Sequence, residues 1–291
     1  MRRAGARRGR AAVTVFAAAL LVGPLLSAAP AARAVANPVL VEATSPSSSE
    51  WNRAVSAICP TGLSVYGGGA EIITDTGAPG NVMLNSASPN DSTLRRWVAQ
   101  AFEVGGDFTG NWRLRVFAIC GPPVPNLQLV VTVSPAGVAD RKTAQATCPA
   151  GTRVYGAGAG IGNGKGEVYL ERVVPGLTSV TVAGRVRTPL SRSWQVGAYA
   201  ICGDPGPLGT LPPIGRFPST VSSNSPQQLD TSCPAGFKVH GAGAEVLDSD
   251  GRVFIDSIIV DSGLLTARAR AYENPATATT WGVAVWVVCL S

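Results

Sequence analysis

Apolar and polar residues alternate along many short segments of this chain, and no window shows the 3.6-residue period of a helix. The clearest alternation runs from a Trp to a Cys eight residues later, at 112–120, 194–202 and 281–289. Every second residue in these segments is apolar, which predicts strands that turn one face to a core. Gly and Pro separate the segments throughout. The pattern predicts an all-β protein in which helix is nearly absent.

Each of these strands closes one copy of a repeated unit. The motif Cys-Pro-x-Gly-x-x-Val-x-Gly-x-Gly-Ala occupies 59–70, 148–159 and 233–244, upstream of the three strands. A repeat of this kind marks one supersecondary unit made three times. We therefore expect three tandem, homologous β modules, each with about six short antiparallel strands.

The internal alignment places the expected strands. In the first copy they are 38–43, 53–58, 63–70, 82–88, 95–104 and 112–119. In the second copy they are 127–133, 142–147, 153–159, 167–174, 179–187 and 194–201. In the third copy they are 219–223, 228–232, 237–246, 252–260, 264–272 and 281–288.

The repeat also predicts the domain organisation. Residues 1–36 precede the first copy, and the modules are 37–121, 122–203 and 218–291, with a Pro-rich linker at 204–217. Pro-rich linkers are semi-rigid spacers, so we expect modules that keep some independence. Packing around one pseudo-threefold axis, as in a β-prism, is the alternative.

The first 36 residues are typical of a signal peptide. Five Arg precede an apolar stretch at 11–26, and small residues offer cleavage after Ala34 or Ala36. Six of the 24 basic residues lie in this segment, which leaves 18 basic against 18 acidic residues in the rest. Since no basic excess remains, we expect a secreted protein that binds neither nucleic acid nor, after cleavage, a membrane.

All six cysteines follow this segment, two in each copy. In an oxidising compartment such pairs form disulfides rather than metal sites. The repeat favours one pairing, in which each copy joins its own first motif to its own last strand: Cys59–Cys120, Cys148–Cys202 and Cys233–Cys289. Loops of this size predict a stabilisation of about 4 kcal/mol for each bridge.

The motif at 59–70 and the strand Trp-x-Val-x-Ala-Tyr-Ala-Ile-Cys at 194–202 resemble a module of uncharacterised secreted actinobacterial proteins, which also follows collagen-like stalks. This resemblance covers nearly all of 38–291 and implies a secreted β module without established catalysis. The three Cys-Pro-x-Gly repeats are similar, more loosely, to the β-prism of vitelline membrane outer layer proteins. That likeness concerns the fold and not the function.

No catalytic, metal or cofactor site is predicted. Asp75-Thr76-Gly77 and Asp261-Ser262-Gly263 imitate aspartic peptidase motifs, but the two Asp do not occupy equivalent positions of their copies, so both are interpreted as turn residues. His240 is the only histidine and stands where the other copies have Tyr. A hydrolase that uses paired carboxylates stays open as an alternative, because their separation in space cannot be derived from the sequence.

Two tryptophans without a counterpart in the other copies are the candidate ligand-binding residues. Trp51 aligns with Asp140 and Ser225, and Trp97 has no Trp partner either. If exposed, both could stack on sugar rings or a partner protein; otherwise they fill a larger core. We expect a secreted, non-enzymatic monomer with internal pseudo-symmetry, which binds polysaccharide, cell wall or a protein.

Overall fold

The computed structural model describes residues 38–75, 79–106, 108–205, 212–218, 220–248 and 250–290. Within them the chain forms eighteen strands, and its helical content is the short 3-10 turn Pro79–Asn81 (η1). The all-β prediction is confirmed. The predicted signal peptide, 1–36, lies outside the described residues, as does 206–211 of the predicted linker.

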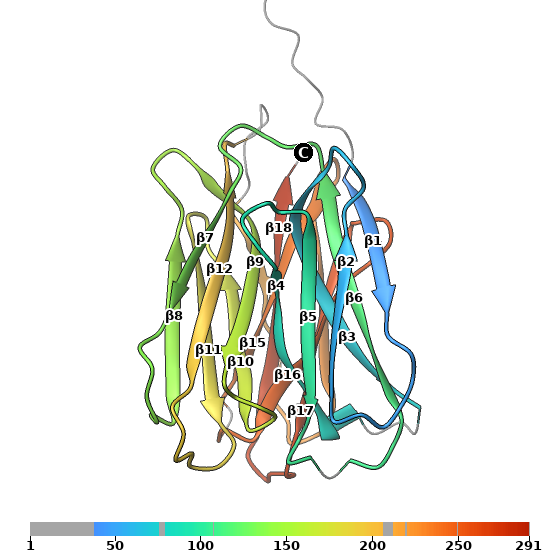
Figure 1. Ribbon diagram of the computed structural model, residues 1–291, viewed down its shortest axis with the longest axis vertical. Coiled ribbons are helices and arrows are strands. Elements are labelled where there is room, and N and C mark those ends of the chain that lie inside the picture. The colour runs from blue at the N-terminus through green and yellow to red at the C-terminus, as the bar shows by residue number, and fades with distance from the viewer. Residues whose placement is uncertain are drawn as a thin grey trace, which may run out of the picture. The chain divides into compact units, whose positions relative to one another are not determined.

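The strands form three six-stranded antiparallel sheets (Figure 1). Sheet I has the order β1 (Val39–Thr44), β6 (Trp112–Gly121), β3 (Ser64–Thr74), β16 (Val253–Val260), β17 (Thr266–Glu273) and β14 (Gln227–Ser232). Sheet II has the order β2 (Asn52–Ile58), β5 (Arg96–Glu103), β4 (Val82–Pro89), β9 (Arg153–Gly162), β12 (Gln195–Gly203) and β7 (Gln128–Val133). Sheet III has the order β13 (Ile214–Arg216), β18 (Gly282–Leu290), β15 (Lys238–Leu247), β10 (Val168–Pro175), β11 (Ser179–Val186) and β8 (Arg141–Thr147).

Each sheet takes half of its strands from one copy and half from the next. In sheet II, β4 of the first copy pairs with β9 of the second through Ala87 and Ala159. In sheet III, β10 pairs with β15 through Val173 and Ala244, and in sheet I β16 pairs with β3 through Ile258 and Ala70. The third copy thereby returns to the first and closes a ring. The three modules are confirmed, but the expectation that they keep some independence is wrong, because no module completes a sheet alone.

The pseudo-threefold axis is marked by equivalent residues that meet in the core. The rings of Tyr66, Tyr155 and His240, all at one position of the motif, have centroids 5.1 to 6.0 Å apart. Further along the core, Met83 packs with Tyr169 and Phe254 in the same way. These contacts support the alternative of packing around one axis.

The Gly after each of these rings is required by the close approach of the three copies. A Cβ at Gly67 would collide with the carbonyl oxygen of His240, and one at Gly156 with that of Tyr66. A Cβ at Gly241 would lie 2.7 Å from the carbonyl oxygen of Tyr155, which closes the cycle. The Gly that follows Val-x in the repeated motif is therefore required because the backbones of the three copies approach closely there.

The disulfides are those that the repeat predicts. Cys59–Cys120, Cys148–Cys202 and Cys233–Cys289 are all formed, each with a Cα–Cα distance of 5.6 Å. Each joins the end of a strand in one sheet to a strand of another sheet. The bridge from Cys59, after β2, to Cys120, in β6, thus links sheet II to sheet I. The three bonds tie the three sheets together pairwise.

One predicted strand is wrong. The first strand of the third copy is β13, inside the segment expected to be a linker. In the described part of the predicted range 219–223, which is 220–223, Ser222 alone forms a bridge, with Trp281. The flanking prolines, Pro213 and Pro218, favoured a linker, yet this short strand lies at the edge of sheet III, where few ladder hydrogen bonds are needed.

Candidate functional site

The face of each sheet that points away from the shared core differs among the three sheets. In sheet I, a central row of this outer face carries Glu71 and Arg115, paired through two guanidinium nitrogens. The next two strands add Asp256 and Arg270, whose Nη2 lies 2.8 Å from Asp256 Oδ2. Ion pairs thus cover the middle of this sheet.

Sheet III has a similar cover. Glu245, at the register of Glu71, pairs with Arg172 of the neighbouring copy. Glu171 forms ion pairs with two arginines, through Oε1 to Arg185 Nε at 3.0 Å and through Oε2 to Arg141 Nε at 2.5 Å. The middle of this outer face is again filled by carboxylates and guanidinium groups in contact.

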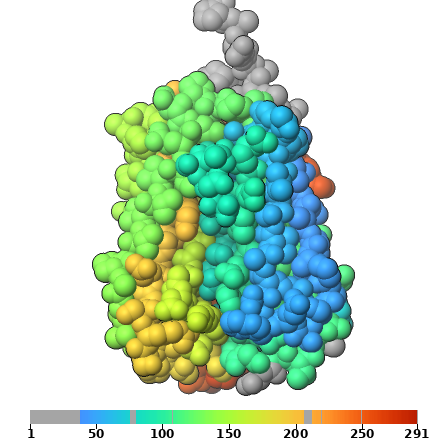
Figure 2. Space-filling model, viewed as in Figure 1, coloured from blue at the N-terminus to red at the C-terminus, as the bar shows by residue number. Residues whose placement is uncertain are grey.

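Sheet II has no such cover. Gly160 stands at the register of Glu71 and Glu245, and Gly197, its cross-strand neighbour, at the register of Arg115. The two glycines leave a depression of about 400 Å³ over β4, β5, β9 and β12, which we call the sheet II hollow. Figure 2 views this face. Its polar lining consists of Asn85, Ser86, Ser88, Asn90, Gln100, Gln195 and Tyr199. Amides and hydroxyls therefore replace the charges of the other sheets.

Tyr199 lies across the floor of the hollow. Ideal Cβ atoms at Gly160 and Gly197 would be 3.5 and 3.1 Å from its Cε2 atom, so the ring covers the space that these glycines leave open. Burial raises the pKa of Tyr199, which keeps the hydroxyl neutral and able both to donate and to accept a hydrogen bond. The ring and the hydroxyl give the hollow an amphipathic surface.

Asn85 is a buried polar residue of the hollow whose hydrogen bonding is incomplete. Its side chain is 4% exposed, and Nδ2 donates to the carbonyl oxygen of Ile161 at 3.1 Å. Its Oδ1 has no partner among the described residues. This oxygen is itself inaccessible and lies toward Gly164, so the missing hydrogen bond is a cost within the protein rather than a contact offered to a ligand.

The position of Asn85 is a β-bulge that recurs in all three sheets. The register shifts at Asn85 in β4, at Glu171 in β10 and at Asp256 in β16. Burial raises the pKa of Asp256 to about 6, even though Arg270 favours its charged form. Sheet II has Asn85 at the bulge and Gln100 in place of Arg270. The buried residues below the hollow are therefore uncharged too, unlike Asp256 and Arg270 in sheet I.

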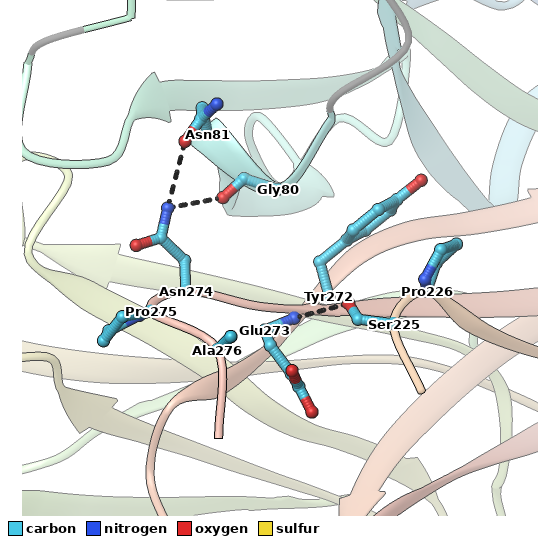
Figure 3. A pocket seen from close by; sticks show the side chains of 9 residues that line it. All are labelled: Gly80, Asn81, Ser225, Pro226, Tyr272, Glu273, Asn274, Pro275 and Ala276. Carbon is cyan, nitrogen blue, oxygen red and sulfur yellow. Dashed lines mark hydrogen bonds between the residues drawn. The ribbon is translucent and has the colours of Figure 1, made fainter. Parts of the chain in front are cut away.

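A second, larger depression lies where the first and third copies meet (Figure 3). Its volume is about 600 Å³, but its polar groups bind one another. Asn274 Nδ2 donates to the carbonyl oxygen of Gly80 at 2.7 Å and to Asn81 Oδ1 at 3.2 Å. The backbone N–H of Glu273 donates to Ser225 Oγ at 3.1 Å. The contacts of Asn274 join the third copy to the first, so we interpret this depression as a joint rather than a binding site.

The two candidate tryptophans have different outcomes. Trp97 is 1% exposed and its indole lies against Gly68, where a Cβ would be 2.6 Å from the ring. A ligand-stacking role for Trp97 is therefore wrong, because this ring fills the core. Trp51 is 48% exposed and packs against Phe102 with ring centroids 5.0 Å apart. It is accessible, and binding through it stays a prediction.

The remaining candidates behave as structural residues. Asp261 accepts hydrogen bonds from the backbone N–H groups of Gly263 and Leu265 at 2.9 and 2.7 Å, which confirms its role in a turn. Burial lowers the pKa of His240 to about 3. Within the described residues, no group of three His, Cys, Asp or Glu could hold a metal ion, and no helix is long and apolar enough to cross a membrane.

Comparisons with known proteins add no function to this geometry. The chain matches no model of a protein family, and a search of curated proteins finds no significant match.

Proposed function

We propose that this protein is a secreted, non-enzymatic binding protein for a neutral polysaccharide, with the sheet II hollow as its site. The observation that carries the proposal is the replacement of charge by amides and hydroxyls in one sheet of three. Amides and hydroxyls can hydrogen-bond to the hydroxyl groups of a sugar, and the ring of Tyr199 can pack on its apolar face. The three disulfides fit an oxidising, extracellular setting.

The alternative of a hydrolase with paired carboxylates finds no support in this region. No Asp or Glu lines the sheet II hollow among the described residues. The buried Glu171, Glu245 and Asp256 each contact an Arg instead. Each of these contacts occupies carboxylate oxygens that catalysis would use.

The proposal is tested by restoring the side chains that the other sheets carry. Gly160→Glu with Gly197→Arg rebuilds the Glu71–Arg115 pair on sheet II and fills the hollow. On an array of neutral and acidic glycans, we expect wild type to bind neutral members and the double variant to bind none. Arg172→Gln with Glu245→Gln, which alters sheet III alone, is the matched control and keeps binding. Absence of wild-type binding to every neutral glycan contradicts the proposal.

A further inference from the structure

The sheet II hollow continues toward an exposed aromatic pair. Along β5, Val98, Gln100 and Phe102 occupy successive positions of the outer face, and the first two line the hollow. Phe102 lies two residues beyond Gln100, which is about 7 Å along the strand. Phe102 is nearly buried because Trp51 packs on it, at an interplanar angle of 58°.

Trp51 is held in place although its ring is half exposed. Its carbonyl oxygen accepts a hydrogen bond from the backbone N–H of Glu103 at 2.9 Å, which fixes it beside the end of β5. Phe102 supports the ring from one side. The equivalent residues in the other copies are Asp140 and Ser225, so the fold does not require an aromatic here. A large apolar ring that is exposed, supported and dispensable to the fold is typical of a ligand contact.

We infer that the hollow and Trp51 bind successive units of one linear neutral polysaccharide. The inference rests on the proposed function and extends it, because it makes the ligand a chain rather than a single sugar. The hollow itself follows β4 from Asn85 to Asn90, a length of about 17 Å. In the pairing of β4 with β5, Ser86 lies opposite Gln100 and Met83 lies opposite Phe102. Phe102 is therefore beyond the Asn85 end of the hollow, and Trp51, which packs on Phe102, adds a stacking position there.

A comparison of ligand lengths tests this inference. Binding of cellohexaose, laminarihexaose and chitohexaose is measured by calorimetry beside the corresponding disaccharides, with wild type and Trp51→Ala. For the hexasaccharide that binds, we expect Trp51→Ala to lower affinity about tenfold, as for a central tryptophan contact. Affinity for the disaccharide stays within about twofold, because the hollow is unchanged. Asp140→Ala, at the same register of the second copy, is the control and leaves both affinities unchanged.

The outcomes separate this inference from the proposed function. If Trp51→Ala binds the hexasaccharide as wild type does, while Gly160→Glu/Gly197→Arg does not, the chain-length inference is overturned and the hollow remains the site. Equal loss for hexasaccharide and disaccharide in Trp51→Ala also overturns it, since Trp51 would then act on the hollow itself. If no oligosaccharide binds wild type, both proposals fail. An unchanged melting temperature of Trp51→Ala shows that the variant is folded.

Discussion

Sheets I and II share a backbone plan but present different outer faces. In sheet I, Arg270 binds the buried carboxylate of Asp256 and reaches across to the carbonyl oxygen of Ile72. In sheet II, the same two positions are Gln100 and Asn85, and Asn85 Oδ1 has no partner within the described part of the chain. One arrangement is complete within the protein, and the other is incomplete. The repeated plan therefore supplies stability, and we expect function where one sheet departs from it.

The largest expected effect is on stability in sheet I. Arg270→Met leaves the carboxylate of Asp256 buried without its partner, and we expect a loss of about 3 to 5 kcal/mol in the free energy of unfolding at pH 7. Gln100→Met, the same change in sheet II, costs less than about 1 kcal/mol because no buried charge depends on it. Chemical denaturation of both variants measures the difference. Equal losses would show that the two faces do not differ as described.

A transplant of the charged pair into sheet II should give the next largest effect. Asn85→Asp places a carboxylate in a buried position that lacks a cation, and we expect it to cost about 2 kcal/mol. The double variant Asn85→Asp/Gln100→Arg rebuilds the pair of sheet I and should recover at least half of that cost. A double-mutant cycle measures the coupling. Strictly additive effects would contradict the equivalence of these positions.

A smaller effect is expected on the pH dependence of the free energy of unfolding, through Asp256. Because the folded-state pKa of Asp256 is about 6 and the ordinary value is 3.8, the folded protein binds the proton more tightly than the unfolded chain. This contribution to stability is complete below pH 3.8 and is lost as pH rises through 6. Asp256→Asn should remove that decline, which amounts to about 1 kcal/mol or more between pH 4.5 and 7.

The opposite trend from His240 does not disturb this measurement. Its lowered pKa makes stability rise between pH 3 and 6.5, equally in wild type and in Asp256→Asn, so it cancels in the difference. A difference between the two proteins that does not change with pH would contradict the raised pKa of Asp256.

Much of the fold could be predicted from the repeat. Alternation and the Trp-to-Cys spacing located most strands, and the equivalence of the copies paired the cysteines correctly. The shared sheets could not be predicted, since pairs such as Ala87–Ala159 depend on contacts between copies that alternation within one strand does not encode. Strand β13 could have been located, because it begins 19 residues before Cys233, close to the 20 residues between Val39 and Cys59.

The site was harder to predict for a physical reason. Trp51 and Trp97 stand out in the sequence because one copy alone has them, but only the structure shows that Trp51 is exposed and Trp97 is buried. The hollow arises from side chains that one sheet lacks. Gly160 stands where the alignment has Glu71 and Glu245, and that signal was in the sequence. The sequence alone could not show that this glycine helps to form a hollow, because the hollow depends on the sheet pairing that brings Gly160 of the second copy beside Ser86 of the first.

The most direct test of the account is the affinity of Gly160→Glu/Gly197→Arg for the neutral hexasaccharide that wild type binds best. Ideal Cβ atoms at these positions meet the Tyr199 ring first, at 3.5 and 3.1 Å, so the ring must shift, and we expect the variant to fold with a loss of about 1 to 3 kcal/mol in the free energy of unfolding. Affinity should fall at least about a hundredfold, since the new ion pair fills the hollow. Wild-type affinity in this folded variant would contradict the claim that the uncharged hollow of sheet II is the binding site.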